Sequence, residues 1–391
     1  MTTYGKFSIA SNSPGMPTGY GVQAEILMNQ LMRDGHKVAA LSNYGLEGRM
    51  NQIETPYGTV PHYPRGYSLY SGDVLPSHHK NFVGESKDPN AIITLYDAWV
   101  YLDVPQLDDL RFWSWTPVDH ISVPPKVKAW ADRPNVKTIA MSPFGQKQFQ
   151  ALDIDASYIP HSVDTKLYKP TQIIDGQDAR KYMGLKDSDF LVGMVSANKA
   201  NGQIHRKAFA ENLLAFAMFQ KQNPNAYLYI HSEPSKVFGG FNLLNLMKAV
   251  GLPQDSVLFA NPEKLRYGYS TEEMAGLYTT MDVLLHASYG EGFGVPAIEA
   301  QACGTRVIGS SWAATPDVLG EDSWLVEGQP FWDEGQSSFF QIPLVPSIIK
   351  ALQEAYKAPR GDSTASIEFA HGFDTDEVWQ RYWKPFITEN L

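Results

Sequence analysis

The stretch that decides the fold is DVLLHASYGEGFGVPAIEAQACGTRVIG, residues 282–309. Its apolar start, residues 283–285, is typical of a buried parallel strand, and the three glycines within residues 290–294 permit a tight turn. Pro296 is acceptable in a first helical turn, because its missing N–H would have no partner there. Residues 305–309 supply a second strand. The stretch therefore predicts a strand–helix–strand unit of an α/β sheet.

A helix that begins just after a glycine turn is a natural anion site. Its first backbone N–H groups, here from about residues 292–297, lack partners within the helix and can bind phosphate. Glu291 lies in the turn, and Glu299 lies eight positions later inside the helix. Because carboxylates accept hydrogen bonds from hydroxyl groups, the pattern indicates a ligand with phosphates and a sugar, namely a nucleotide or a nucleotide sugar. The alternative is an ordinary glycine connection with two solvated acids.

The run EGFGVPAIE, residues 291–299, resembles the E-x7-E signature of the retaining glycosyltransferases of the GT-B fold. Its continuation, AIEAQACGTRVIGSS, resembles the family 4-like group. The resemblance implies that Glu291 contacts hydroxyl groups of the donor sugar and that Glu299 binds the ribose of the nucleotide. It also implies that the backbone amides of four turn residues hold the diphosphate: Gly292, Phe293, Gly294 and Val295.

Length and composition limit the class of protein. A chain of 391 residues suits two domains of ordinary size, and 43% hydrophobic with 19% charged residues is typical of a globular protein. No apolar run approaches the length that spans a bilayer. Residues 1–11 lack the pattern of a secretory signal, and the single cysteine excludes an internal disulfide, so we expect a cytoplasmic protein. A net charge of −10 argues against a broad nucleic-acid surface.

The order of predicted elements favours an α/β protein with two Rossmann-like domains, which the resemblance implies face each other across a cleft. We expect an N-terminal, acceptor-side domain over residues 1–166 and a nucleotide-sugar-binding domain over residues 167–373. The polar segment 166–178 suits a linker. An aromatic, amphipathic run at 376–386 predicts a terminal helix. The resemblance implies that this helix crosses back to the first domain, so we assign residues 374–391 to that domain.

The first domain opens with a predicted strand at 6–11, a loop, and a helical pattern at 22–32. The loop contains Gly19 and Gly21, and a lone glycine-rich loop is weak evidence for a phosphate site. The resemblance implies that it faces the donor diphosphate across the cleft.

Residues 44–90 have little periodicity and predict a partly irregular insertion on the acceptor side. His78, His79 and Lys80 lie within it. Adjacent histidines point in different directions, and no acidic residue has ligand spacing to them, so we interpret this run as a solvated loop rather than a metal or phosphate site.

Polar side chains follow two further predicted strands, 91–95 and 112–116. Asp97 follows the first, and Asp119 and His120 follow the second, at strand ends where ligands of open α/β sheets bind. The resemblance implies a histidine beside the donor sugar and the attacking acceptor oxygen. His120 and Asp119 are both candidates, and Asp97 competes. Three nearby tryptophans are candidates for a sugar-stacking surface or for the core: Trp99, Trp113 and Trp115.

The second domain opens with an apolar strand at 190–196 and a helix at 208–222. Arg206 and Lys207 lie at the junction between them, where two cations can neutralise a diphosphate; a solvated basic loop is the alternative. The resemblance implies that a lysine at the start of this helix and an arginine near the strand end bind the donor phosphates. Lys207 matches the lysine, and Arg206 or Asn198 matches the second position.

A short predicted strand at 257–260 ends at Asn261. The resemblance implies that this strand end holds the nucleobase through backbone groups, which makes Asn261 a base-side candidate.

These features predict a glycosyltransferase that moves a sugar from a UDP- or GDP-type donor to an acceptor hydroxyl, with retention at the anomeric carbon. Backbone N–H groups with Arg206 and Lys207 can stabilise the departing diphosphate, so we expect neither a metal nor another cofactor. The acceptor stays open among a glycan, a small molecule, a protein, a lipid carrier and a modified nucleobase. The alternatives are a nucleotide-sugar epimerase or phosphorylase of the same fold, and a nucleotide-sugar binding module without activity.

Overall fold

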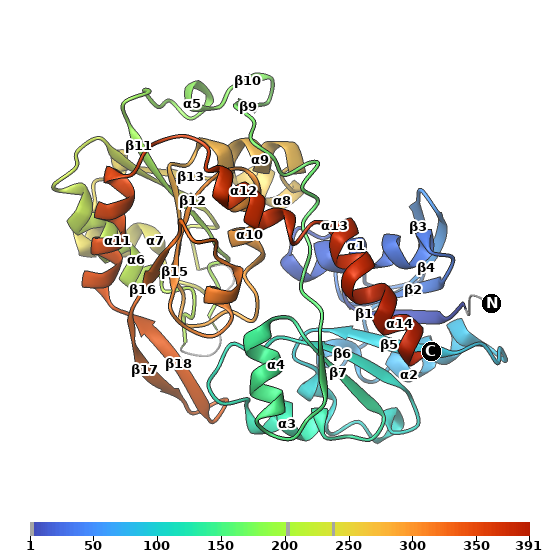
Figure 1. Ribbon diagram of the computed structural model, residues 1–391. Coiled ribbons are helices and arrows are strands. Elements are labelled where there is room, and N and C mark those ends of the chain that lie inside the picture. Colours follow the sequence, from blue (N-terminus) through green and yellow to red (C-terminus); the bar gives the residue numbers. More distant parts are fainter. Residues whose placement is uncertain (1–3, 201–203, 237–238) are drawn as a thin grey trace. The chain divides into compact units, whose positions relative to one another are not determined.

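The computed structural model describes residues 4–200, 204–236 and 239–391. The chain divides into two compact units (Figure 1). Unit 1 comprises Met1–Ser162, Glu334–Ser338 and Thr375–Leu391, and unit 2 comprises Val163–Asp333 and Phe339–Asp374. Each unit is built on a largely parallel sheet with helices, which confirms the predicted α/β class with two Rossmann-like domains.

Unit 1 contains an eight-stranded sheet with the order β3-β4-β2-β1-β5-β6-β7-β8. All neighbouring strands pair in parallel except β3 and β4. Parallel strands are covered on both faces, and Ile92 and Ile93 in the middle of the sheet are fully buried. The strands are β1 (Lys6–Asn12), β2 (Lys37–Tyr44), β3 (Asn51–Thr55), β4 (Gly58–Tyr63), β5 (Asn90–Leu95), β6 (Phe112–Thr116), β7 (Val136–Ala140) and β8 (Ala156–Tyr158).

The helices of unit 1 follow clear start signals. The side chain of Thr18 accepts a hydrogen bond from the Gly21 N–H and caps the first helix, and Ser142 caps α4 through the Gly145 N–H. The helices are α1 (Gly19–Arg33), α2 (Leu75–Val83), α3 (Pro125–Ala131), α4 (Pro143–Gln150), α13 (Thr375–Val378) and α14 (Lys384–Asn390), with a π-helical turn at Trp379–Trp383. Short 3-10 turns occupy Leu69–Ser71, Ala98–Tyr101 and Pro105–Leu107.

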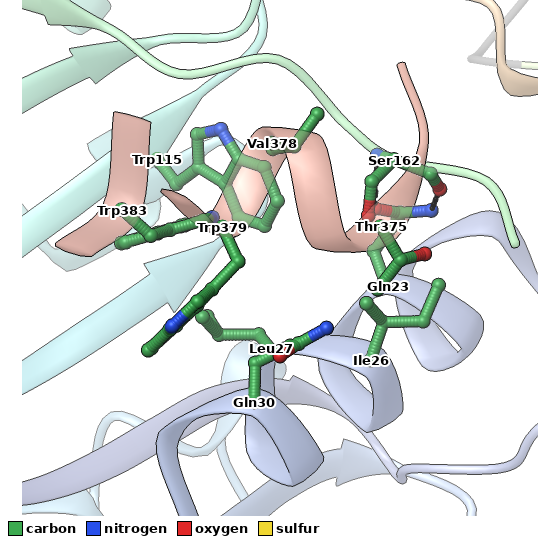
Figure 2. A pocket seen from close by; sticks show the side chains of 10 residues that line it. All are labelled: Gln23, Ile26, Leu27, Gln30, Trp115, Ser162, Thr375, Val378, Trp379 and Trp383. Atoms are coloured by element: carbon green, nitrogen blue, oxygen red, sulfur yellow. Dashed lines mark hydrogen bonds between the residues drawn. The ribbon is translucent and has the colours of Figure 1, made fainter. Parts of the chain in front are cut away.

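The C-terminal helices pack on the N-terminal part of unit 1 through tryptophan. The rings of Trp383 and Trp115 meet edge to face with centroids 5.0 Å apart, and the Trp379 indole N–H donates to Asp34 at 3.0 Å. Figure 2 shows the three tryptophans, Trp115, Trp379 and Trp383, beside a cavity of about 10 Å³ between α1 and the terminal helices. Gln23 closes one side by bonding both ways with the backbone of Ser162. The cavity has room for about one water molecule, so it belongs to the core.

Residues 44–90 are more regular than predicted. The β3–β4 hairpin adds an antiparallel edge to the sheet, and α2 follows it. The interpretation of His78 and His79 as a solvated loop is wrong, because both lie on α2. His79 is buried, with Nδ1 2.8 Å from Ser8 Oγ and Nε2 3.1 Å from Asn90 Oδ1. Ser8 lies far away in the sequence and Asn90 beyond the end of α2, and the two side chains complete the hydrogen bonds that a buried imidazole requires.

Unit 2 contains a six-stranded parallel sheet with the order β13-β12-β11-β14-β15-β16. Its strands are β11 (Phe190–Val195), β12 (Ala226–His231), β13 (Val257–Phe259), β14 (Val283–His286), β15 (Val307–Ser310) and β16 (Trp324–Val326). Two small antiparallel pairs lie outside it, β9 (Ile173–Ile174) with β10 (Gln177–Asp178), and β17 (Gly328–Asp333) with β18 (Ser338–Pro343).

The core of unit 2 forms where helices pack on this sheet. Phe209, Leu213 and Phe216 recur at helical spacing on α6 and are all buried. Burial of each such side chain contributes about 1.5–3 kcal/mol. The helices are α5 (Ala179–Tyr182), α6 (Phe209–Gln220), α7 (Leu243–Val250), α8 (Pro262–Tyr267), α9 (Thr271–Thr280), α10 (Val295–Ala302), α11 (Val345–Lys357) and α12 (Thr364–His371). Further 3-10 turns lie at Gln254–Ser256 and Thr315–Val318.

In the part of the chain that the structure describes, no helix combines the length and the apolar character needed to cross a bilayer.

Candidate functional site

The candidate site lies where the strand order of unit 2 reverses. From β11 the chain builds outward through β12 and β13, and then returns to place β14 on the other side of β11. Open α/β sheets bind ligands at the carboxyl ends of the strands at such a switch point. Arg206 and Lys207 follow β11, and Glu291 follows β14. The topology therefore brings the predicted cations and the predicted acid to one place.

The glycine turn after β14 adopts the geometry that the sequence predicts. Gly294 has φ +105°, in the left-handed region that favours glycine, and a Cβ there would lie 3.1 Å from His286 Nε2. Gly294 is also the cap residue of α10, which begins at Val295 with no side-chain cap. Gly292 and Phe293 are buried, and the Phe293 ring packs on Phe373. A helix start that no side chain caps leaves backbone donors for an anion.

Glu291 is the centre of a buried ion cluster. Lys207 Nζ lies 2.5 Å from Glu291 Oε1, and Arg206 Nη1 lies 3.1 Å from Glu291 Oε2. Arg206 Nη1 also donates to the Gly290 carbonyl oxygen at 3.0 Å. The Glu291 side chain is 6% exposed, against 19% for Lys207 and 36% for Arg206. The carboxylate is thus enclosed, whereas the two cations reach toward solvent.

The charges around Glu291 decide its ionisation. Burial alone would raise the pKa of Glu291, but the positive charges of Lys207 and Arg206 outweigh burial and hold this pKa well below its usual range. His286 Nε2 is 3.8 Å from Glu291 Oε1, too far for a hydrogen bond. Burial lowers the pKa of His286 to about 4. At neutral pH the cluster therefore combines one carboxylate, two cations and a neutral imidazole.

Glu299 has a different environment from Glu291. The hydroxyl of Tyr278 donates to Glu299 Oε2 at 2.7 Å. Burial raises the pKa of Glu299, and hydrogen bonds from Tyr278 and Tyr168 partly oppose that rise. Hydroxyl donors therefore surround this acid, whereas cations surround Glu291.

Two asparagines predicted at the donor site have structural partners. The buried Asn198 amide donates to the carbonyl oxygens of Phe241 at 2.7 Å and Glu233 at 3.0 Å, and its Oδ1 accepts from the Phe241 N–H at 2.9 Å. Asn261 Oδ1 caps α8 by accepting two backbone N–H groups. Asn198 therefore braces a loop of unit 2 and Asn261 a helix start, and their roles in donor binding stay predictions.

In unit 1 the structure pairs two of the three acceptor-side candidates. His120 Nδ1 lies 2.6 Å from Asp119 Oδ1, and His120 is buried. Asp97 stands before the Ala98–Tyr101 turn that follows β5. Their catalytic roles stay predictions. The prediction that Gly19 and Gly21 lie in a loop is wrong, because both belong to the first turn of α1, which Thr18 caps. Their role in donor binding stays a prediction.

The tryptophans near these candidates differ in exposure. Trp113 and Trp115 are 0% and 2% exposed and belong to the core rather than to a surface that stacks on sugars. Trp99 is partly buried, and Lys126 Nζ lies 5.0 Å from the centre of its ring.

Three residues at the site were not singled out from the sequence. His286 is the one polar residue in the strand VLLH, and its Nε2 lies 3.8 Å from Glu291 Oε1. Tyr278 and Tyr168 reach Glu299 from α9 and from the segment that opens unit 2. A polar residue at the end of a buried strand is a usable signal for His286, whereas no local pattern marks the two tyrosines.

Within residues 4–200, 204–236 and 239–391 there is no group of three or more histidine, cysteine or acidic side chains arranged to hold a metal ion.

Comparison with known proteins points to the part of the chain that contains Glu291 and Glu299. Residues 239–333, which include Glu291 and Glu299, match the family described as glycosyl transferases group 1. D-inositol 3-phosphate glycosyltransferase of Arthrobacter sp. is 31% identical over 144 residues, 36% of this chain and 29% of the relative. The mannosyltransferase WbdA of Escherichia coli is 24% identical over 197 residues, 50% of this chain and 20% of the relative. The matches thus span less than a third of each of these relatives.

Solved structures match over the whole chain. Sucrose-phosphate synthase of Thermosynechococcus elongatus superposes with a TM-score of 0.75 at 20% identity, covering 98% of both chains. HepE of Anabaena, solved in complex with UDP-glucose, superposes with a TM-score of 0.67 at 15% identity, covering 98% of this chain and 99% of that one. Residues 239–333 thus match the glycosyl transferases group 1 family, and the chain as a whole has the fold of the GT-B glycosyltransferases.

Proposed function

We propose that this chain is a glycosyltransferase that moves a sugar from a UDP- or GDP-sugar to an acceptor hydroxyl, with retention of anomeric configuration. The observation that carries the proposal is the ion cluster of Glu291 with Lys207 and Arg206 beside the start of α10. Two further observations support it. Glu291 lies inside the segment that matches the group 1 family, and a protein of the same fold was solved with UDP-glucose.

In this cluster, Lys207 and Arg206 can exchange the Glu291 carboxylate for the phosphate oxygens of a bound donor. Without a ligand, Glu291 compensates the charges of Lys207 and Arg206. A donor diphosphate brings phosphate oxygens that compete for the same two cations and for the amides at the start of α10. The carboxylate that the cations release can then accept hydrogen bonds from sugar hydroxyls. In this proposal one constellation recognises both halves of the donor.

Catalysis follows from the charge that develops on the leaving group. As the bond between the anomeric carbon and the phosphate oxygen breaks, negative charge grows on the diphosphate, where Lys207, Arg206 and backbone N–H groups stabilise it. The acceptor oxygen bonds to the anomeric carbon on the same face, and its proton passes to the departing phosphate oxygen. Two protein cations supply the positive charge at this point, so the proposal includes no metal and no other cofactor.

The acceptor side is assigned to unit 1, with His120, Asp119 and Asp97 as candidate groups. A glycan, a small molecule, a protein, a lipid carrier or a modified nucleobase is a candidate acceptor.

The test is a reaction of the whole chain with UDP- and GDP-sugars and a panel of acceptors, in buffer with EDTA. Released nucleotide and glycosylated product are measured together, the latter by mass spectrometry. We expect one donor to give equal amounts of nucleotide and of product with an added sugar. Isomerised donor would instead indicate an epimerase, and turnover that requires inorganic phosphate would indicate a phosphorylase. Binding without turnover would indicate a binding module, and activity lost in EDTA and restored by a divalent cation would contradict metal independence.

A further inference from the structure

Glu299 is held by two tyrosines from separate parts of unit 2. Tyr278 comes from α9 and is 0% exposed, and its hydroxyl donates to Glu299 Oε2 at 2.7 Å. Tyr168 comes from the first residues of unit 2, and with Tyr278 it opposes the rise that burial causes in the pKa of Glu299. The two rings lie near one another, with centroids 6.2 Å apart. The hydrogen bond from Tyr278, with Tyr168 beside it, gives the carboxylate of the half-buried Glu299 a defined orientation.

The segment that carries Tyr168 is itself anchored. The Tyr168 N–H donates to the Asp164 carbonyl oxygen at 2.8 Å, and the Thr165 hydroxyl donates to Asp374 Oδ2 at 2.6 Å. The nearby Val163 N–H donates to the Phe373 carbonyl oxygen at 2.9 Å. Tyr168 therefore approaches Glu299 from a fixed backbone.

This arrangement leaves part of the carboxylate available. An ionised carboxylate offers about four acceptor sites on its two oxygens, and the Tyr278 hydroxyl occupies one of them. The remaining sites can accept hydrogen bonds from two neighbouring hydroxyl groups of a ligand. Because the tyrosines fix the plane of the carboxylate before a ligand binds, little ordering is left for the binding step.

We propose that Tyr278 and Tyr168 are positioning residues, which orient Glu299 so that it selects ligands with the paired hydroxyls of a ribose over ligands that lack them. The inference rests on the proposed function, because it takes Glu299 as the group that contacts the nucleotide ribose. It extends that function by assigning selection of ribonucleotides to two residues that need not touch the ligand.

A purely structural role for the tyrosines gives a different result. If their hydroxyls only satisfied a buried acid, their loss would lower stability or weaken all nucleotides equally. If they position Glu299, their loss lowers the preference for the ribose hydroxyls in particular. The ratio of two dissociation constants separates the two roles, because general effects on the fold cancel in it.

The experiment measures calorimetric Kd values for UDP and 2′,3′-dideoxy-UDP, and for GDP and its dideoxy form, with the full chain. The variants are Tyr278→Phe, Tyr168→Phe and Glu299→Gln, which keep most of each side chain's volume. Tyr356→Phe is the matched control, because its hydroxyl bonds Asn225 Oδ1 at 3.0 Å in another part of unit 2. We expect wild type and Tyr356→Phe to prefer the ribose form equally. We expect each of the other variants to reduce that preference by on the order of tenfold, the size of one hydrogen bond to a charged group.

The outcomes are distinguishable. If Glu299→Gln loses the preference while both tyrosine variants keep it, the positioning role is wrong and the ribose role of Glu299 stands. If the tyrosine variants weaken both nucleotides by the same factor, their role is structural and the inference is overturned. If wild type itself shows no preference, the ribose role of Glu299 in the proposed function fails. Should Tyr278→Phe not fold, as judged by its thermal midpoint, Tyr168→Phe carries the test.

Discussion

The two units place their candidate residues in contrasting ways. In unit 2, Arg206 and Lys207 come from one segment, and Glu291 comes from another that is far away in the sequence. Both cations lie within 3.1 Å of the buried Glu291 carboxylate. In unit 1, His120 pairs with Asp119, and these two candidates are neighbours in the chain. A convergence of distant charges is strong evidence for a site, because leaving charges buried without partners is costly. A contact between neighbours is weaker evidence.

The two sheets have similar topology, so topology does not explain this contrast. In unit 1, β1 stands between β2 and β5, and the strand order reverses there as it does at β11 in unit 2. At the unit 1 switch point, the Ser11 hydroxyl donates to the Leu95 carbonyl oxygen at 3.2 Å, a contact between uncharged groups. The difference lies in the chemistry at the strand ends. Unit 2 brings two cations to one carboxylate, whereas unit 1 places Asp97 after β5 and the pair of Asp119 with His120 after β6. Fixed cations suit a diphosphate, which is what the proposed donor presents.

The largest expected effect comes from removing the central carboxylate. Glu291→Gln should lower kcat/KM for sugar transfer by on the order of 10²–10³-fold, because the group that contacts the sugar hydroxyls is lost. UDP affinity should not fall, since the phosphates no longer compete with Glu291 for Lys207 and Arg206. Steady-state kinetics and calorimetry check the two parts. Glu354→Gln on α11 is the control. If Glu291→Gln kept turnover within twofold of wild type, Glu291 would not be the central group, and the candidates of unit 1 would be favoured instead.

Variants in unit 1 should separate transfer from donor binding. We expect His120→Asn and Asp119→Asn to slow transfer at least about tenfold, as for loss of a group that moves or orients a proton. Their UDP affinity should stay within about twofold of wild type, because the phosphates are assigned to unit 2. Asp109→Asn, a change at an exposed acid, serves as the reference. Loss of UDP binding in either site variant would assign donor contacts to unit 1 instead.

Two glycines at the start of α1 should respond in opposite ways. A Cβ on Gly21 would lie 2.5 Å from the Met16 carbonyl oxygen, whereas a Cβ on Gly19 meets nothing within 4 Å. We therefore expect Gly21→Ala to lower the free energy of unfolding by about 1–3 kcal/mol and Gly19→Ala to leave it nearly unchanged. Urea denaturation of both variants measures this difference. Equal stability would show that the start of α1 can relax and is not a rigid part of unit 1.

Buried histidines are a property that the two units share. Burial lowers the pKa of His161 in unit 1 to about 3 and that of His286 in unit 2 to about 4, both from an ordinary value of 6.5. Below pH 6.5 the unfolded chain therefore binds protons that the folded chain does not, so stability is full above pH 6.5 and falls as the pH drops toward these values. Each histidine contributes a slope of up to about 1.4 kcal/mol per pH unit.

The variants His161→Phe and His286→Leu should each reduce that slope between pH 6.5 and 5, measured by urea denaturation at several pH values. The exposed His371→Asn should leave the slope unchanged. An unchanged slope in both buried variants would show that neither imidazole is kept neutral by burial.

Regular elements were predictable where short apolar runs end at turn residues. The predicted strands at 91–95, 112–116 and 190–196 match β5, β6 and β11 to within one residue at each end. Residues 44–90 were not predictable in this way, because β4 pairs with β2 across a long separation in the chain. The burial of His79 depends on Ser8 and Asn90, which no local pattern links to it.

The candidate site was predictable to a similar depth. Strand ends and a glycine turn mark positions along the chain, and these marks pointed to Glu291, Arg206 and Lys207. Two further features depend on side chains that meet only in the folded chain. Lys207 and Arg206 both contact Glu291, and the Tyr278 hydroxyl donates to Glu299. The local sequence of this protein therefore indicates where the site residues lie along the chain, but not which side chains pair with one another.

The central claim is that Lys207 and Arg206 hold the diphosphate of a nucleotide sugar. The most direct test is calorimetric titration of UDP and GDP into wild type, Lys207→Met, Arg206→Met and Lys350→Met, the last a change at an exposed lysine on α11. The account predicts that one nucleotide binds wild type and Lys350→Met equally, and that each of the two site variants weakens its binding by on the order of tenfold or more. Equal affinity of all four proteins for that nucleotide would contradict the claim.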